Sequence, residues 1–153
     1  ELSPPILYEL GLGAAIEWLG EDFAKRYGFQ VYCQGTDQAC EIAESLRVLF
    51  FRSARELLTN ITKHAKATEV HIALETYNDR VTMTITDNGK GLDPGKSGDA
   101  LAGKNSLGLF SIREQMKYIG GAFEFDSRQG HGTKVTLTAH IRNPANIEAD
   151  TGR

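Results

Sequence analysis

The sequence predicts an α/β (α+β) two-layer sandwich, in which a mixed, largely antiparallel sheet carries helices on one face only. Three observations favour this fold class. Apolar residues recur at helical spacing in three separate segments. Two alternating β-branched runs, Glu69–Tyr77 and Arg80–Asp87, are joined at Asn78-Asp79, which indicates a β-hairpin. These strands have one apolar and one polar face, so helices are expected to cover one face.

The elements are expected in the order helix, strand, helix, two strands, loop, helix, two strands. The first helix rests on the apolar residues between Leu7 and Phe23, including Leu10, and Gly28 ends it. The others are expected as a strand at Phe29–Cys33, a helix at Cys40–Ala67, the two hairpin strands, a loop at Asn88–Asn105, a helix at Ser106–Ile119, and strands at Ala122–Ser127 and Thr133–Ile141.

The composition fits one folded domain and excludes some function classes. The chain has 153 residues and a net charge of −3, without the run of Lys or Arg that a nucleic-acid interface needs. No apolar stretch approaches the roughly 18 residues that suggest a membrane helix. Cys33 and Cys40 are too few for a disulfide framework, so we expect two reduced cysteines in a cytoplasmic domain.

The segment before the third helix has the composition of a long mobile loop. Residues 88–105 are rich in Gly, Lys and Asp, and a loop longer than about 12–15 residues in a compact domain is usually functional or disordered. Asn105-Ser106-Leu107-Gly108-Leu109 then begins a helix, whose free N–H groups and positive end suit a phosphate. Gly95-Lys96-Ser97 resembles the end of a Walker A loop, but Lys90 occupies the position of the required first glycine.

One edge of the second helix carries four polar side chains. Glu56, Asn60, Lys63 and His64 lie at i, i+4, i+7 and i+8, beside the arc of apolar residues that faces the core. A hard oxygen ligand together with cations is what a magnesium–phosphate group needs. Taken alone, the same pattern also fits a solvated polar face.

Two further polar residues are expected on the apolar face of the sheet. Alternation places Asp87 in phase with Val81 and Met83, and Thr133 in phase with Val135. A buried carboxylate needs a donor, and the exocyclic amine of a purine would serve. The glycines that follow Asp87 allow a close approach of backbone to a ligand. An acid that simply ends a strand at a tight turn is the alternative.

Together these pieces resemble the Bergerat-type ATPase fold of histidine kinases, DNA gyrase, a heat-shock chaperone and mismatch-repair proteins. Glu56 to Ala65 resembles its N box, and Asp87-Asn88-Gly89-Lys90-Gly91 its first glycine box. Ser106–Gly108 resembles the end of its lid, and Gly130-His131-Gly132-Thr133 its closing Gly-x-Gly-Thr. Four motifs in the right order, over about 80 residues, are far more specific than one motif.

The subfamily resemblance is to kinases that signal to response regulators with helix-turn-helix output domains. Residues 107–114, Leu-Gly-Leu-Phe-Ser-Ile-Arg-Glu, and the start of the chain, Leu2-Ser3-Pro4-Pro5 with Leu10-Gly11-Leu12, are similar to theirs. Ser106 and Ser111 stand where glycine is often found. The resemblance implies the end of a dimerisation helix and a linker at 1–28, the ATP-binding domain at 29–142, and a tail at 143–153.

The resemblance also implies a role for each matching residue. Asn60 would hold Mg²⁺, Lys63 and His64 would face the phosphates of ATP, and Asp87 would bind the adenine amine with Thr133 supporting it through water. Glu56 corresponds to the catalytic base of the ATP-hydrolysing relatives, whereas the alternative for kinases is a base beside the phosphoacceptor histidine. The backbone around the nucleotide would come from the remaining residues of the two glycine motifs, Gly89, Gly91, Leu92, Ser106, Leu107, Gly108 and Leu109.

The implied function is transfer of the γ-phosphoryl of Mg-ATP to a histidine on a dimerisation domain, for relay to the receiver domain of a response regulator. None of the four histidines of this chain lies in a phosphoacceptor motif. The full-length protein is expected to be a homodimer that binds no nucleic acid. Membrane anchoring of this full-length protein is compatible with the resemblance. An ATP-hydrolysing clamp and a serine-kinase or anti-sigma-type module of the same fold are the alternatives.

Overall fold

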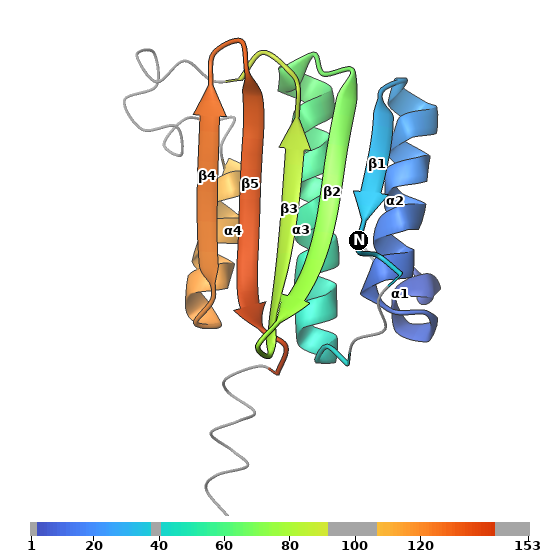
Figure 1. Cartoon of the computed structure of the whole chain (residues 1–153), viewed down its shortest axis with the longest axis vertical. Coiled ribbons are helices and arrows are strands. Elements are labelled where there is room, and N and C mark those ends of the chain that lie inside the picture. The colour runs from blue at the N-terminus through green and yellow to red at the C-terminus, as the bar shows by residue number, and fades with distance from the viewer. Residues whose placement is uncertain (1–2, 38–40, 92–106, 143–153) are drawn as a thin grey trace, which may run out of the picture.

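The computed structural model describes residues 3–37, 41–91 and 107–142 (Figure 1). Its elements, in chain order, are α1 (Pro5–Glu9), α2 (Leu12–Tyr27), β1 (Gln30–Gln34), α3 (Glu44–Asn60), a π-helical turn η1 (Ile61–Ala65), β2 (Glu69–Tyr77), β3 (Arg80–Asp87), α4 (Leu107–Tyr118), β4 (Ala122–Arg128) and β5 (Gly132–His140). None of the described helices is long and apolar enough to cross a lipid bilayer.

The five strands form one mixed sheet in the order β1-β2-β3-β5-β4. β1 runs parallel to β2, whereas the other three neighbouring pairs are antiparallel. The described helices all cover the same face of the sheet, with α4 behind β4 and β5, α3 behind β2 and β3, and α2 beside β1 (Figure 1). The two-layer sandwich with a largely antiparallel sheet is therefore confirmed.

The hairpin between β2 and β3 has the predicted boundaries. Asn78 and Asp79 both have positive φ, at 50° and 61°. Two consecutive residues with positive φ form the turn whose twist matches that of the flanking strands, and Asn and Asp tolerate this conformation. The turn fixes the register that pairs Val70 with Asp87, and thereby places Asp87 at one end of the sheet.

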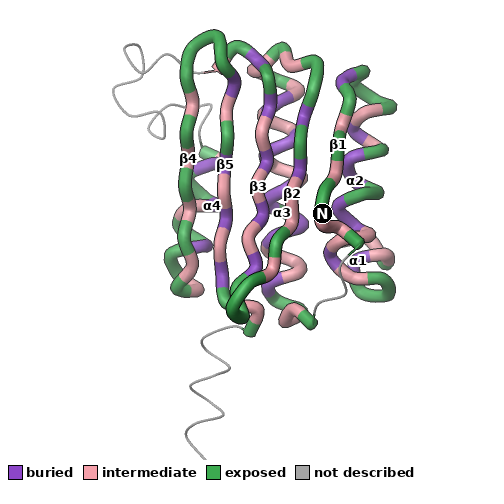
Figure 2. Tube along the Cα trace, in the orientation of Figure 1, coloured by how far each residue is buried: buried purple, intermediate pink, exposed green. Residues whose placement is uncertain are grey.

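The core lies between the sheet and the helices, where buried residues line the inner faces of both layers (Figure 2). β3 contributes Val81, Met83 and Ile85, which alternate with half-buried threonines. α3 contributes Phe50, Phe51, Ala54, Leu57 and Leu58, all 4% exposed or less. Because one side of α3 is fixed in this way, its opposite edge is held beside α4.

Several predicted boundaries were wrong, and those of the last two strands differ by one residue. The first helical run divides at Leu10, which is 70% exposed, and Gly11, whose φ of 92° does not fit a helix. The second helix begins at Glu44 and its last turn is π-helical, and the first strand starts one residue later than expected. Ile16 and Leu19 of α2 belong to the same core as α3, while the assignment of residues 1–28 to a dimerisation helix and linker remains a prediction.

Candidate nucleotide site

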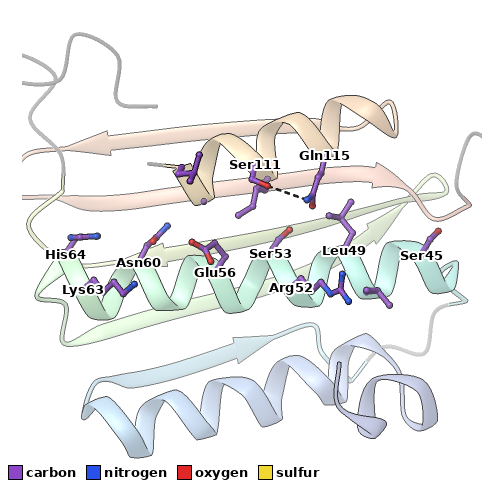
Figure 3. A pocket seen from close by; sticks show the side chains of 14 residues that line it. Ser45, Leu49, Arg52, Ser53, Glu56, Asn60, Lys63, His64, Ser111 and Gln115 are labelled. Atoms are coloured by element: carbon purple, nitrogen blue, oxygen red, sulfur yellow. Dashed lines mark hydrogen bonds between the residues drawn. The ribbon is translucent and has the colours of Figure 1, made fainter. Parts of the chain in front are cut away.

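The four polar residues of the second helix line one cleft. Glu56 and Asn60 lie on α3, and Lys63 and His64 follow on the π-helical turn (Figure 3). The cleft encloses about 830 Å³, and its other wall is α4. The helix edge predicted from the spacing therefore forms one wall of a cleft, in which Lys63 is exposed and the other three side chains are half-buried.

The wall opposite Glu56 is the first turn of α4, and Gly108 sits directly against the Glu56 side chain. A Cβ added at Gly108 would lie 2.0 Å from Oε1 and 2.6 Å from Cδ of Glu56. A larger residue at this position would displace the Glu56 side chain, so Gly108 leaves room for the carboxylate between α3 and α4. Leu107, which also lines the cleft, is 72% exposed, whereas the side chain of Leu109 is 8% exposed and packs in the core.

Two polar atoms along this cleft are buried without a hydrogen-bond partner in the described part of the chain. They are Nδ2 of Asn60 and Oγ of Ser53. A buried polar group without a partner is unfavourable by about 1–3 kcal/mol, and native structures contain few of them. Both atoms are in cleft-lining residues, so a polar ligand in the cleft would supply the missing partners.

The π-helical turn joins the cleft to the end of β3. Its last carbonyl, on Ala65, accepts the backbone N–H of Lys90 at 2.7 Å, and the carbonyl of Lys90 accepts the N–H of Gly130 at 2.6 Å. Gly89 packs on the same turn, where an added Cβ would lie 2.2 Å from the Ala65 oxygen. π-helical turns within helices occur frequently at functional sites.

Asp87 ends β3 on the helix-covered face of the sheet and is only 5% exposed. Its Oδ1 accepts the backbone N–H of Gly89 at 2.8 Å. Burial raises the pKa of the Asp87 carboxyl above its usual range, and the backbone N–H groups of Gly89 and Thr133 offset part of that rise. A buried carboxyl with a perturbed pKa is typical of a functional site.

The turn between β4 and β5 completes this end of the sheet. Thr133 pairs with Asp87 across the strands, and its hydroxyl lies 2.8 Å from the hydroxyl of Ser127. Gly132 has a φ of 81°, and a Cβ there would lie 1.9 Å from the Asp87 carbonyl oxygen. Gly91, with a φ of 67°, approaches the Arg128 carbonyl in the same way. Because these glycines have no side chain, three backbone segments can pack closely together around Asp87.

The predicted site residues form two neighbouring groups. The cleft contains Glu56, Asn60, Lys63, His64, Leu107 and Gly108. The strand-end group contains Asp87, Gly89, Gly91 and Thr133, and the Ala65–Lys90 hydrogen bond connects the groups. Leu109 lies next to the cleft but in the core, and Leu92 and Ser106 lie outside the described residues.

Sequence reasoning missed two features of the site. The Oδ1 of Asn88 accepts the backbone N–H groups of Thr68 and Glu69, both at 2.9 Å, and its Nδ2 donates to the Thr68 hydroxyl at 2.9 Å. These hydrogen bonds of Asn88 fix the position of the glycine motif, residues 87–91, relative to the start of β2. The cleft also extends to Ser53, and continuing the helical arc backwards from Glu56 by three residues would have found it.

Residues 46–143 match the family described as histidine kinase-, DNA gyrase B- and HSP90-like ATPases. The match includes every predicted residue of the cleft and the strand-end group around Asp87. The chain therefore belongs to this ATPase family.

Sensor histidine kinases are among the similar proteins within that family. The chain is 34% identical over 146 residues to the sensor histidine kinase MctS of Rhizobium johnstonii, which covers 95% of this chain and 31% of MctS. It is 31% identical over 141 residues to the oxygen sensor histidine kinase NreB of Staphylococcus carnosus, which covers 92% of this chain and 40% of NreB. The chain thus spans less than half the length of these relatives.

Solved structures show the same fold. The blue-light activated histidine kinase of Erythrobacter litoralis EL346 superposes with a TM-score of 0.73 at 19% identity, over 88% of this chain and 43% of that one. Full-length ShkA in complex with AMPPNP gives a TM-score of 0.67 at 17% identity, over 84% of this chain and 29% of that one.

Proposed function

We propose that this chain is the catalytic domain of a sensor histidine kinase, which binds Mg-ATP and transfers its γ-phosphoryl group to a histidine outside these 153 residues. The observation that carries the proposal is the buried Nδ2 of Asn60, which has no hydrogen-bond partner in the described part of the chain and lies on the cleft wall between the carboxylate of Glu56 and the side chains of Lys63 and His64. The similarity to MctS and NreB favours this function over an ATP-hydrolysing clamp or a serine kinase.

The adenine end of the ligand would bind at Asp87. The carboxylate already accepts one backbone N–H from Gly89 and has further lone pairs for the exocyclic amine of adenine. Ionised Asp87 accepts from an amine but would repel a carbonyl oxygen, so the group selects adenine over a base with oxygen at that position. Thr133 would support the base through a water molecule, because its hydroxyl already bonds to Ser127.

The phosphates would lie along the cleft from Lys63 and His64 towards Glu56, with Gly108 opposite. Among the described residues, no group of three or more His, Cys, Asp and Glu side chains could hold a metal ion. A Mg²⁺ ion at Asn60 would therefore complete its shell with phosphate oxygens and water, as this ion prefers. When bound, the ion neutralises charge that develops on the phosphate oxygens.

The amide of Asn60 fits this group because rotation about its last side-chain bond turns either the oxygen or the nitrogen towards the cleft. Glu56 lies one helical turn earlier, at the end of the phosphates, which supports it as the catalytic carboxylate. Leu107 and Leu109 flank Gly108 at the start of α4 and would hold its backbone in place, with Gly91, Leu92 and Ser106 completing the nucleotide contacts.

We further propose that the full-length protein has the partners of a two-component kinase. The full-length protein would be a homodimer with its own phosphoacceptor domain, and the phosphoryl group would pass on to a response regulator receiver domain, of the type with a helix-turn-helix output domain. The domain would act in the cytoplasm. These proposals are supported by the kinship to MctS and NreB.

The test uses radiolabelled ATP and two proteins. Alone, this chain is expected to bind Mg-ATP without labelling itself, because none of its histidines lies in a phosphoacceptor motif. Mixed with the phosphoacceptor domain of its own full-length protein, it should produce a phosphate that is labile in acid and stable in base. Glu56→Gln should retain nucleotide binding and lose most of the transfer. Acid-labile label on this chain alone would contradict the proposal.

A further inference from the structure

The cleft continues past Glu56, beyond the residues that the proposed nucleotide needs. α3 contributes Leu49, Arg52 and Ser53 to this stretch, and α4 contributes Ser111 and Gln115 (Figure 3). Ser111 and Gln115 are joined by a hydrogen bond of 3.4 Å, so they form one polar strip opposite α3. None of these five residues is among the proposed nucleotide contacts.

Ser53 is the unusual residue of this stretch. It is 2% exposed, and its Oγ has no hydrogen-bond partner in the described part of the chain. Its side chain points from α3 towards α4, into the cleft (Figure 3). A serine hydroxyl buried without a partner is unfavourable, and a polar group of a ligand in the cleft would supply the partner that Ser53 lacks.

The direction of phosphoryl transfer indicates what that ligand is. In such reactions the attacking and leaving atoms lie roughly in line through the phosphorus. With the phosphates lying from Lys63 towards Glu56, the acceptor must approach from beyond Glu56 along the same cleft. Ser53 lies three residues before Glu56 and faces that approach, because residues three apart are neighbours on a helix.

We propose that the stretch of cleft past Glu56 is a subsite for the acceptor imidazole, and that Ser53 positions the ring by accepting its N–H. This inference rests on the proposed function, whose acceptor is a histidine. A neutral imidazole has one nitrogen with a free lone pair and one that carries a hydrogen. Leu49 and the 4%-exposed Ile112 supply the apolar surface that the ring faces need.

The subsite selects the reactive form of the ring. With its N–H held by Ser53, the unprotonated nitrogen faces the γ-phosphorus. That nitrogen forms a bond to phosphorus while the bond from phosphorus to the β–γ bridging oxygen breaks, and ADP leaves with the bonding pair. The ring N–H then loses its proton to solvent. Ser53 therefore acts through orientation, as a positioning residue, and exchanges no proton itself.

The experiment compares two small probes, imidazole and 1-methylimidazole, by NMR titration of the chain loaded with Mg-AMPPNP. The second probe lacks the N–H that Ser53 would accept. In the native sequence we expect imidazole to shift the amide signals of residues 49–53 and 111–115, and to bind more tightly than 1-methylimidazole. In Ser53→Ala the affinity for imidazole should fall about fivefold, the ratio expected for one hydrogen bond.

The controls separate the two proposals. Ser53→Ala should leave the affinities for 1-methylimidazole and for AMPPNP unchanged. Two results would contradict the acceptor subsite while nucleotide binding stands, provided that AMPPNP binds. The first is equal affinity of the native protein for imidazole and 1-methylimidazole. The second is that Ser53→Ala weakens the binding of neither probe, or of both probes equally. If AMPPNP itself does not shift Glu56, Asn60 and Lys63, the proposed function fails and the subsite with it.

Discussion

The two halves of the site are built in different ways. Around Asp87, backbone segments approach so closely that added Cβ atoms at Gly89, Gly91 and Gly132 would lie 2.2 Å or less from carbonyl oxygens, and Asp87 has backbone donors. Along the cleft, side chains of two helices face an open space, and Asn60 and Ser53 each have a buried polar atom without a described partner.

We infer from this difference that the half around Asp87 is rigid, whereas the cleft half is completed by its ligands. Buried polar groups that already have partners resist rearrangement, whereas groups without partners gain them when a ligand arrives. The base of a nucleotide is the same at every stage of the proposed reaction, while the phosphates, metal and acceptor change. In the proposed function, the rigid half would bind the part of the ligand that stays constant, and the incomplete half would lie where the chemistry takes place.

The largest effect is expected from Gly132→Ala in the rigid half. The variant combines the strain of an L residue at a φ of 81° with a contact of 1.9 Å to the Asp87 carbonyl oxygen, so β3 and β5 must separate. Gly130→Ala is the matched control, since Gly130 has the same φ of 81° but no atom within 4 Å.

Urea denaturation should show that Gly130→Ala lowers the free energy of unfolding by about 1–2 kcal/mol, the ordinary cost of this conformation. Gly132→Ala should lower it considerably more and abolish ADP binding. Equal losses for the two variants would mean that the close approach around Asp87 does not hold the strand ends together.

Asp87→Asn should weaken ADP binding by about 10- to 100-fold, which corresponds to the roughly 1–3 kcal/mol of a mispaired buried polar group. The fold should be unharmed, because the asparagine oxygen can still accept the Gly89 N–H. Calorimetry with ADP and denaturation of the same variant measure the two quantities. Unchanged ADP affinity in a folded variant would remove the adenine assignment.

The raised pKa of Asp87 predicts opposite pH effects on folding and on binding. Between the usual carboxyl pKa and the raised one, the folded protein holds more protons at this group than the unfolded chain, so this contribution to stability falls as pH rises. Binding of the adenine amine needs the ionised form, so ADP affinity falls on acidification through the raised pKa. Titration of ADP affinity against pH checks this, and Asp87→Asn should flatten the curve.

A smaller and more selective effect is expected from Asn60→Asp in the open half. The carboxylate is a stronger ligand for Mg²⁺ but repels phosphates when the metal is absent. ATP affinity should therefore depend more steeply on Mg²⁺ than in the native protein, while adenosine, which lacks phosphates, should bind equally to both. Loss of adenosine binding in this variant would show that the two halves do not act separately.

The rigid half could be predicted from sequence, and the open half only in part. Alternation along β3 placed Asp87 on the inner face because a strand has a fixed period of two. Helical spacing grouped Glu56, Asn60, Lys63 and His64 on one edge, but it cannot distinguish a π-helical last turn from an α-helical one. The break after Leu10 was missed because apolar residues are also found on surfaces.

Ser53 and Gly108 show where the sequence signal ends. The burial of Ser53 and the contact of Gly108 with Glu56 both depend on how α3 and α4 pack, and these helices are separated by two strands and the segment 92–106. Local sequence patterns do not report how two helices that are so far apart along the chain pack against each other. The family resemblance supplied the role of Gly108, but it gave no reason to examine Ser53.

The most direct test of the two-half site is calorimetry with ADP and with inosine diphosphate, on the native protein and on Asp87→Asn. The two ligands share their phosphates and differ by an amine or a carbonyl oxygen at one position of the base. We expect the native protein to bind ADP at least about tenfold more tightly, because Asp87 accepts from the amine and repels the oxygen, and we expect Asp87→Asn to remove most of that preference. Equal affinities for ADP and inosine diphosphate in the native protein would contradict the account, because Asp87 would then not face the base.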